Sequence, residues 1–193
     1  RGQGFGRALM HTLIESARGA GLATMQLEVI TTNTPAHTLY IDLGFKTLRR
    51  LLIVECQHVP DPITPRPVDI VPTQEALAYY DWHAVPNPWQ RQREGLLVAL
   101  KGTTGWLVRD GAAVQAYAVG IIAPGLIYLL DAASAPGQGD ALRGLITGLH
   151  HMHPEFAFRF VNLGEDDPAW PLLADLGFVE TLSQYEMEFP LLS

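Results

Sequence analysis

The sequence predicts an α+β fold, a mixed sheet flanked by helices, in one and a half copies arranged in tandem. Three observations predict it. Amphipathic helical segments alternate with short, β-rich segments along the chain. An Asp-Gly pair at positions 110–111 lies between two apolar runs, which indicates an antiparallel hairpin. The chain also resembles itself at a shift of 133 residues, from Gly44 to Gly177, where an Asp-Leu-Gly-Phe run returns.

Composition narrows the class of protein. A chain of 193 residues that is 48% hydrophobic can form a core and is too apolar for disorder. A net charge of −7 argues against nucleic acid or an anionic membrane as the main partner. The single cysteine, Cys56, indicates a reducing cytoplasm and a packed apolar role. Residues 112–130 carry no charge, but Gly120, Pro124 and Gly125 interrupt them, which predicts two strands and a turn rather than a membrane span.

The chain opens on a glycine-rich segment ahead of a predicted helix, and this segment predicts an anion site. Glycines at alternate positions let the backbone turn and come close to a ligand. The first N–H groups of the helix lack partners and carry positive potential, to which two arginines add their charge. Simple turn chemistry is the alternative to a phosphate or pyrophosphate cradle. The segment consists of Arg1, Gly2, Gln3, Gly4, Phe5, Gly6 and Arg7.

The next elements follow from apolar spacing and from capping residues. The helix from residue 8 carries an apolar stripe that we expect to pack on a sheet, and it ends at Gly19 and Gly21. Residues 25–29 alternate with a period of two, which predicts a strand. Thr34 and Pro35 predict an N-cap and a first-turn proline for a short helix that ends at Gly44. The stripe consists of Leu9, Met10, Leu13, Ile14 and Ala17.

In these residues the chain resembles the GNAT-superfamily N-acetyltransferases. The family's pyrophosphate loop has the pattern Q/R-x-x-G-x-G/A, which residues 1–6 fit. A second family run, L-x-V-x-x-x-N-x-x-A-x-x-L-Y-x-x-L-G-F, is matched throughout from Leu27 to Phe45. The dinucleotide-binding fingerprint G-x-G-x-x-G is a weaker rival, because the third glycine comes one residue early.

The resemblance implies a function and a set of site residues. GNAT enzymes transfer an acetyl group from acetyl-CoA to an amine, here expected on a small molecule, and no metal is expected. Residues 1–7 would hold the coenzyme A pyrophosphate, with Asn33 and Ala36 among the cofactor-binding residues. Tyr40 would be the general acid that protonates the leaving thiolate. The alternatives are a core aromatic for Tyr40 and an Asx-turn before Pro35 for Asn33.

The self-similarity divides the chain into three parts. Residues 1–57 are expected to be the C-terminal half of a first GNAT unit, and residues 73–193 a second, degenerate but complete GNAT-like domain. Between them, residues 58–72 carry five prolines and predict a semi-rigid linker. We expect a further segment upstream of Arg1, and a non-catalytic coenzyme A-binding or assembly module is the alternative function. An open sheet edge predicts that residues 23–56 pair with the second unit or, in a homo-oligomer, with another copy.

The second unit is predicted from similar signals. Thr73 is the expected cap of its first helix, and an apolar strand after the Asp-Gly hairpin runs into a second glycine loop. The expected helices are residues 73–82, 90–100, 138–152 and 168–176. The expected strands are residues 106–109, 112–119, 126–132, 157–163 and 183–189.

Substitutions in the second glycine loop predict that this copy has lost its donor chemistry. Near the loop the shift becomes 135, so that residues 137–139 repeat the Gly-Gln-Gly of residues 2–4 and Pro136 precedes them. A carboxylate at Asp140 would repel a pyrophosphate, and Leu173 stands where the first unit has its phenol. We therefore expect the copy to pack on the first unit and shape its acceptor cleft.

Two further side-chain clusters are expected to be structural. The histidines at 150, 151 and 153 lie near a predicted helix C-terminus, where cations interact well with the dipole, and no cysteine stands at a metal-site spacing. Four aromatic residues flank the loop between the first two helices of the second unit. Ordinary packing is favoured for them over a role at the acceptor site. They are Tyr79, Tyr80, Trp82 and Trp89.

Overall fold

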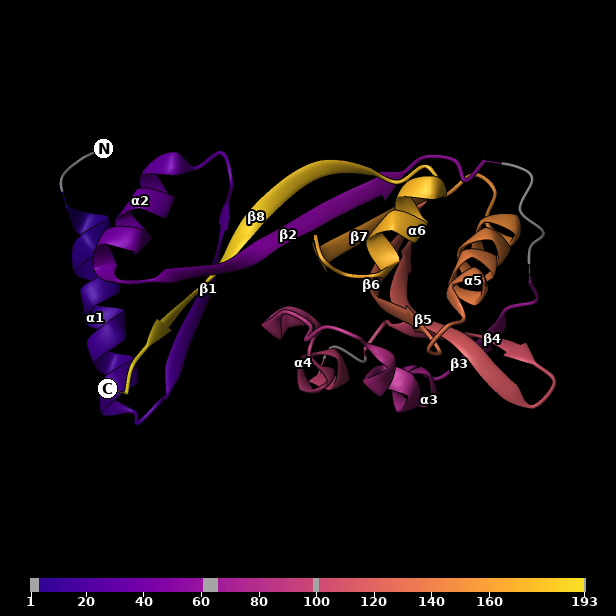
Figure 1. The fold of residues 1–193 in the computed structure, drawn as a ribbon, viewed down its shortest axis with the longest axis horizontal. Helices are drawn as coiled ribbons and strands as arrows, with labels where there is room; N and C mark the ends of the chain where they lie inside the picture. The colour runs from indigo at the N-terminus through magenta and orange to yellow at the C-terminus, as the bar shows by residue number, and fades with distance from the viewer. Residues whose placement is uncertain (1–3, 61–65, 99–100, 193) are drawn as a thin grey trace. The chain divides into compact units, whose positions relative to one another are not determined.

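The computed structural model describes residues 4–60, 66–98 and 101–192, and the chain forms two compact units (Figure 1). Unit 1 contains the residues up to Leu51 together with those from Ser183 onward, and unit 2 contains Leu52–Leu182. Strands β2 (Lys46–Cys56) and β8 (Val179–Pro190) cross this division, so each contributes residues to both units. The division therefore differs from the boundaries expected at residues 57 and 73.

Unit 1 packs two helices on a short sheet. The elements lie where the sequence predicts them, and Gly44 closes the second helix with a φ of 101°. Within the unit the strand order is β1-β8-β2, and β1 pairs antiparallel with residues 184–190 of β8. The expected pairing of this segment with the C-terminal part of the chain is thus confirmed. The elements are α1 (Phe5–Gly19), β1 (Thr24–Ile30), α2 (Thr34–Leu43) and parts of β2 and β8.

Unit 2 contains the Asp-Gly hairpin, the second glycine loop and the helices around them. Gly111 takes a φ of 58° in the hairpin turn, as a left-handed turn position requires. Its strands are β3 (Asp69–Val71), β4 (Thr104–Asp110), β5 (Ala113–Ala123), β6 (Leu126–Ser134) and β7 (Ala157–Gly164). Its helices are α3 (Thr73–Ala76), the 3₁₀ helices η1 (Leu77–Trp82) and η2 (Trp89–Arg91), α4 (Arg93–Val98), α5 (Gly139–Met152) and α6 (Ala169–Asp175).

The sheet of unit 2 lies between two groups of helices. One buried apolar cluster joins the sheet to α5 and α6, and another joins it to α3, η1 and α4. The strand order is β2-β7-β6-β5-β4-β3, antiparallel from β3 to β6 and parallel between β6 and β7. Cys56 is buried in the first cluster, and burial raises the pKa of its thiol. This confirms its expected role as a packed residue.

The expected linker ends earlier than residue 72. Asp69–Val71 forms β3 and pairs antiparallel with β4. The pairing is held at its start by an ion pair, because Asp69 Oδ2 accepts a hydrogen bond from Arg109 Nε at 2.9 Å. The next two residues are β-branched and favour a strand. Residues 61–65 lie outside the described residues.

Two expected helices of unit 2 are shorter than the sequence suggests. Only the first four residues of the segment 73–82 are α-helical, and the rest is 3₁₀. Thr73 does not cap this helix, because the N-cap position is occupied by Pro72 and Thr73 is the first helical residue; its hydroxyl lies 2.9 Å from the hydroxyl of Thr103. The segment 90–100 is divided at Gln92, whose extended ψ of 148° separates η2 from α4. Residues 99–100 lie outside the described residues.

The two glycine loops correspond at a shift of 133, so the expected shift of 135 is wrong. Gly4 and Gly137 have φ values of 75° and 77°. A Cβ built on Gly6 would lie 3.4 Å from Leu39, and one on Gly139 would lie 3.3 Å from Leu172. Gly6 therefore lets the start of α1 approach α2, and Gly139 lets the start of α5 approach α6. The loop of unit 2 keeps this backbone geometry despite its other substitutions.

Part of the apolar stripe of α1 does not pack on the sheet. Ile14 and Ala17 are buried as expected, but Leu9 and Leu13 are 61% and 45% exposed. At the shift of 133 their counterparts on α5 are Leu142 and Ile146, which are 2% and 0% exposed beneath β4, β5 and β6. The strands described in unit 1 supply no such cover. The predicted amphipathic character of α1 is confirmed, but the prediction that its whole apolar stripe packs on a sheet is wrong for Leu9 and Leu13.

Candidate functional site

The glycine loop of unit 1 begins a helix in the way an anion site requires. Gly4 is the N-cap of α1 in a left-handed conformation, and no side chain caps the helix. The unpaired N–H groups of the first turn are therefore open to a ligand. Arg7 donates a hydrogen bond to Asp42 at 3.1 Å between two exposed side chains, a contact that an anion could replace at little cost. Arg1, Gly2 and Gln3 lie outside the described residues, and Phe5 is exposed.

The second motif of unit 1 places Asn33, Ala36 and Tyr40 on or beside α2. Asn33 caps the helix, because its Oδ1 accepts the N–H of Ala36 at 3.4 Å, so the predicted cap at Thr34 is wrong and Thr34 is the first helical residue. Tyr40 packs against the core of unit 1, with its ring centroid 5.8 Å from that of Phe45. Its hydroxyl forms no hydrogen bond with any described residue, so it can donate to a ligand. The roles of these residues in binding and catalysis stay predictions.

A β-bulge in unit 2 turns one acidic side chain into the interior. The register between β5 and β6 shifts where Val119 faces Asp131 and Gly120 faces Leu129. Leu130 is the extra residue, and a bulge of this kind re-aims the side chain that follows it. Leu130 and Asp131 therefore both point toward the helices α3, η1 and α4. The Asp131 side chain is fully buried.

Four donors converge on the Asp131 carboxylate, and together they form what we name the Asp131 cluster. Asp131 Oδ2 accepts hydrogen bonds from Tyr117 Oη at 2.6 Å and from His83 Nε2 at 3.1 Å. Its Oδ1 accepts from Arg91 Nη2 at 2.8 Å and from Asn87 Nδ2 at 3.4 Å. A buried carboxylate with this many donors and a cation beside it stays ionised.

Electrostatics in the Asp131 cluster follow from burial and from the Arg91 charge. Burial alone would raise the pKa of Asp131, but the Arg91 guanidinium and the bonds from His83 and Tyr117 outweigh it and hold this pKa below its usual value. Burial and the neighbouring carboxylate raise the pKa of Tyr117 far above its usual value. Tyr117 therefore keeps its proton and donates it in the hydrogen bond to Asp131.

The hydrogen bonds also fix the tautomer of His83. Its Nε2 lies 3.1 Å from Asp131 Oδ2 and 3.0 Å from Tyr117 Oη. The carboxylate only accepts, and the tyrosine has already donated its proton to that carboxylate, so Nε2 must carry the hydrogen. In the neutral ring Nδ1 is then an acceptor. Nδ1 makes no hydrogen bond with any described residue.

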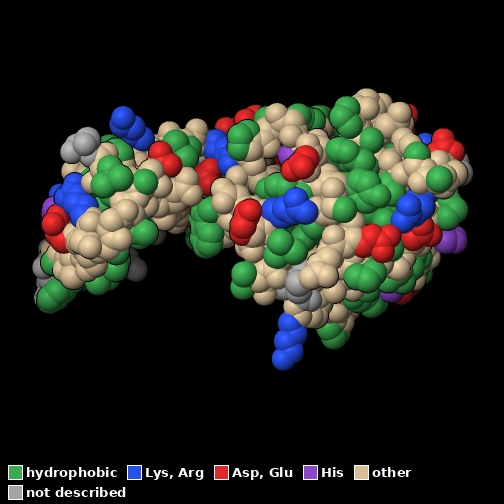
Figure 2. All heavy atoms as spheres, turned by 90° about the horizontal axis from the view of Figure 1, so that it is seen from below, with side chains coloured by type: hydrophobic (Ala, Val, Ile, Leu, Met, Phe, Trp, Pro, Cys, Tyr) green, Lys and Arg blue, Asp and Glu red, His purple; other side chains and the backbone are tan. Residues whose placement is uncertain are grey.

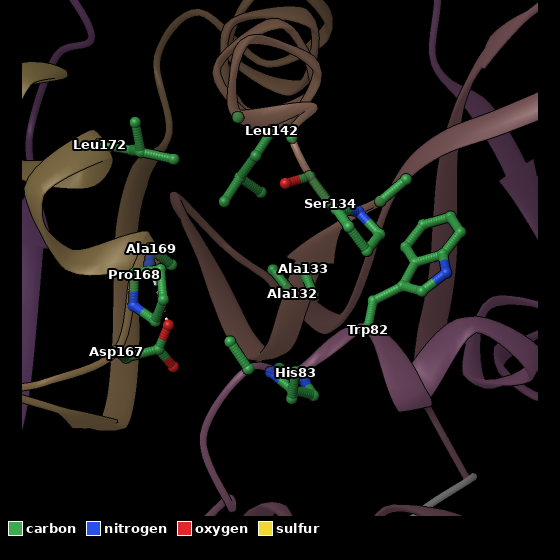
Figure 3. A pocket seen from close by; sticks show the side chains of 15 residues that line it. Trp82, His83, Ala132, Ala133, Ser134, Leu142, Asp167, Pro168, Ala169 and Leu172 are labelled. Carbon is green, nitrogen blue, oxygen red and sulfur yellow. Dashed lines mark hydrogen bonds between the residues drawn. The ribbon is translucent and has the colours of Figure 1, made fainter.

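His83 also lines two adjoining hollows of unit 2. The first, here named the loop cavity, measures about 220 Å³ and lies at the second glycine loop and the start of α5. Figure 3 shows Trp82 and Asp167 on opposite sides of this cavity, and His83 across from Leu142. The second, named the side groove, measures about 630 Å³ and runs along residues 80–87 and 92–94. His83 therefore lines both hollows.

The other predicted features of unit 2 have mixed outcomes. Leu173 is buried, so no phenol stands at the position that Tyr40 has in unit 1. Asp140 is exposed and lies 3.9 Å from Arg143, which partly offsets its charge at the helix start. Tyr79 and Trp82 pack with ring centroids 4.8 Å apart, as expected of structural aromatics, although Trp82 also lines the loop cavity.

No three side chains among the described His, Cys, Asp and Glu residues come together so as to hold a metal ion. No helix in the described ranges is both long and apolar enough to cross a membrane. On the face drawn in Figure 2, basic and acidic side chains are interspersed.

Sequence reasoning missed the Asp131 cluster because its members lie far apart in the chain. A signal was nonetheless present. Asp131 is the one charge in a long apolar run from residue 111 to 139, and a charge in such a run needs a buried partner. The Pro86-Asn87-Pro88 loop and Arg91 could have been nominated as that partner.

Comparison with known proteins assigns the fold. Residues 1–45 match the model of the acetyltransferase (GNAT) family. The structure of a GCN5-related N-acetyltransferase from Sphaerobacter thermophilus is similar over 100% of this chain and 70% of that one, with 17% identity and a TM-score of 0.70. One from Kribbella flavida is similar over 94% and 74%, with 14% identity and a TM-score of 0.61.

A third similar structure is that of a protein with a tandem GNAT organisation of its own. A tandem GNAT protein from the clavulanic acid biosynthesis pathway is similar over 100% of this chain and 72% of that one, with 13% identity and a TM-score of 0.63. A comparison with curated protein sequences found no match. The chain therefore has the GNAT acetyltransferase fold, a mixed sheet flanked by helices.

Proposed function

We propose that the protein is an acetyl-CoA-dependent N-acetyltransferase that transfers an acetyl group to an amine of a small-molecule acceptor. The observation that carries this proposal is the loop at the head of α1, where Gly4 turns the backbone with a φ of 75° inside the part that matches the family model. Amides at such a helix start favour a diphosphate, the anionic group of coenzyme A. The GNAT fold of the whole chain supports acyl transfer.

In this proposal each predicted residue of unit 1 has one task. The loop from Arg1 to Arg7 binds the pyrophosphate, with Asn33 and Ala36 beside the pantetheine arm. Tyr40 donates a proton to the thiolate as the thioester breaks. Its free hydroxyl supports this role, whereas the cap that Asn33 gives to α2 leaves only part of its amide for a ligand. Acetyl-CoA supplies the acetyl group when bound.

We infer further that the chain contains two related copies of one unit. The matching glycine conformations at positions 4 and 137 and at 44 and 177 support this, as does the tandem protein among the similar structures. The first copy contributes α1, β1 and α2, and the second contributes α5, β7 and α6. In this view unit 2 retains a glycine loop of its own.

The test of the donor site is calorimetric titration of coenzyme A into the protein and two variants. Gly4→Val places a β-branched residue in a left-handed conformation at the start of α1, and we expect it to weaken binding at unit 1 at least about tenfold. Gly21→Val is the matched control, because Gly21 has a φ of 72° just beyond the other end of α1. Equal affinity and stoichiometry in all three proteins would overturn the assignment of this loop.

The exposed face of α1 favours a second candidate function, assembly without turnover. We propose that two copies of the chain meet through this face and through β1, the outermost described strand of unit 1. Pairing β1 with its symmetry mate would bring the two α1 helices onto one face of a joined sheet and cover both apolar faces. The exposed apolar residues of this face are Phe5, Leu9 and Leu13.

Sedimentation velocity tests this assembly. We expect the wild-type chain to be dimeric at micromolar concentration and the double variant Leu9→Glu/Leu13→Glu to be monomeric, because four carboxylates would face one another in the interface. Leu48→Glu, a change at a comparably exposed leucine of β2, should leave the dimer intact. A wild-type monomer would contradict the proposal.

A further inference from the structure

His83 belongs to the Asp131 cluster through only one of its two ring nitrogens. It follows η1 in an extended conformation, and its side chain is 9% exposed. Nε2 is held by Asp131 and Tyr117. Nδ1 makes no hydrogen bond with any described residue, and it is not among the buried side-chain atoms that lack a partner, so a ligand can reach it.

His83 lines both the loop cavity and the side groove. The loop cavity on one side carries the glycine loop of unit 2, with Gly137 in the conformation that Gly4 has in unit 1. The side groove on the other side carries Asp81 and Glu94, two carboxylates that attract an ammonium group, together with Arg93. A thioester in the cavity and an amine in the groove would therefore meet beside the imidazole.

We propose that unit 2 holds a second acyl-transfer site, in which Nδ1 of His83 takes the proton from an acceptor amine bound in the side groove. This inference rests on the proposed function, since an acyl thioester of coenzyme A is the co-reactant. Asp131 is a positioning residue: it orients the ring through Nε2–H and stabilises the imidazolium that forms, as a carboxylate does in other acid–base pairs. Arg91 in turn keeps that carboxylate ionised.

The proton and electron balance of the step is complete. His83 takes one proton from the ammonium group, and the neutral amine attacks the thioester carbonyl to form the C–N bond. As the adduct collapses, the C–S bond breaks and the thiolate takes the second proton from nitrogen. The products are an amide and a free thiol, and the imidazolium returns its proton to solvent. No phenol is required, which fits the buried leucine at position 173.

Two variants test the proposal by steady-state kinetics with acetyl-CoA and a panel of amines. In a Gly4→Val background, which disables the donor loop of unit 1, we expect His83→Ala to lower the remaining kcat about 10²- to 10⁴-fold with little change in KM for acetyl-CoA, and added imidazole to restore part of the rate. His151→Gln, at an exposed histidine near the end of α5, is the control and should be unchanged. Tryptophan fluorescence checks folding, because all four tryptophans lie in unit 2.

A second measurement does not depend on turnover. Nitrogen-15 NMR of the imidazole is expected to show the Nε2–H tautomer, and an added primary amine should shift the Nδ1 resonance. A ring with its hydrogen on Nδ1 would overturn the proposal. If turnover is found and His83→Ala leaves kcat unchanged, this inference fails while the proposed function stands. If no amine is acetylated although coenzyme A binds, both the acetyltransferase function and this inference fail.

Discussion

Replacing Arg91 by methionine is expected to destabilise unit 2 by about 3–5 kcal/mol, because it leaves the Asp131 charge buried without its cation. The guanidinium is itself almost wholly buried and lies 2.8 Å from Asp131 and 3.6 Å from Asp167. The Cζ atom of Arg91 also lies over the Phe160 ring, 4.7 Å from the ring centroid. Methionine would keep much of the packing volume but none of the charge. Urea unfolding followed by tryptophan fluorescence measures unit 2 alone.

A surface arginine supplies the matched control for this prediction. Arg109 also bonds two carboxylates, Asp69 at 2.9 Å and Glu75 at 3.1 Å, but all three side chains are substantially exposed. Arg109→Met should therefore cost no more than about 1 kcal/mol. Adding Asp131→Leu to Arg91→Met should recover part of the loss, since the unpaired charge is removed. Equal effects of the two arginine variants would show that the Asp131 cluster is not a buried ion pair in solution.

The fold could be predicted to a large extent because its signals are local. Glycine stops, an N-cap with proline and an Asp-Gly turn located α1, β1, α2 and the β4–β5 hairpin, and all four are found. Two predictions were wrong because their outcome depends on tertiary contacts. In the segment 73–82, predicted to be one helix, residues 77–82 form a 3₁₀ helix, and Leu9 and Leu13, predicted to pack on the sheet, are exposed. Amphipathic spacing specifies which face is apolar, and only the tertiary neighbours decide whether that face is covered.

The candidate sites were less accessible to sequence reasoning. In unit 1 the sequence nominates site residues because two motifs keep fixed spacing between Arg1 and Phe45, and the roles of these residues stay predictions. In unit 2 the letters of the glycine loop favour a shift of 135, whereas the backbone conformations match at 133. The Asp131 cluster depends on a bulge, and Gly120, the glycine opposite it, was interpreted as an interruption although β5 continues through it. One extra residue at Leu130 decides on which face Asp131 lies.

Gly120→Ala is the second variant with a large expected effect, because the bulge that turns Asp131 inward needs a glycine opposite it. A Cβ at this position would lie 2.2 Å from the carbonyl oxygen of Tyr128 and 2.9 Å from the Trp106 ring. Overpacking usually costs about 1–3 kcal/mol, and a clash with backbone belongs at or above the upper end. We expect a loss of about 3 kcal/mol in urea unfolding of unit 2.

The clash expected for Gly120→Ala is mainly with backbone, which makes the predicted loss of stability specific. The nearer atom belongs to the β6 backbone, so shrinking the ring with Trp106→Leu should not rescue Gly120→Ala. Gly95→Ala in α4 is the control: its Cβ would find its nearest atom at an ordinary 3.5 Å, and alanine favours a helix by about 0.5–1 kcal/mol. A Gly120→Ala protein as stable as Gly95→Ala would mean that β5 can withdraw from Tyr128. The bulge would then not be fixed by packing, and the inward position of Asp131 would need another cause.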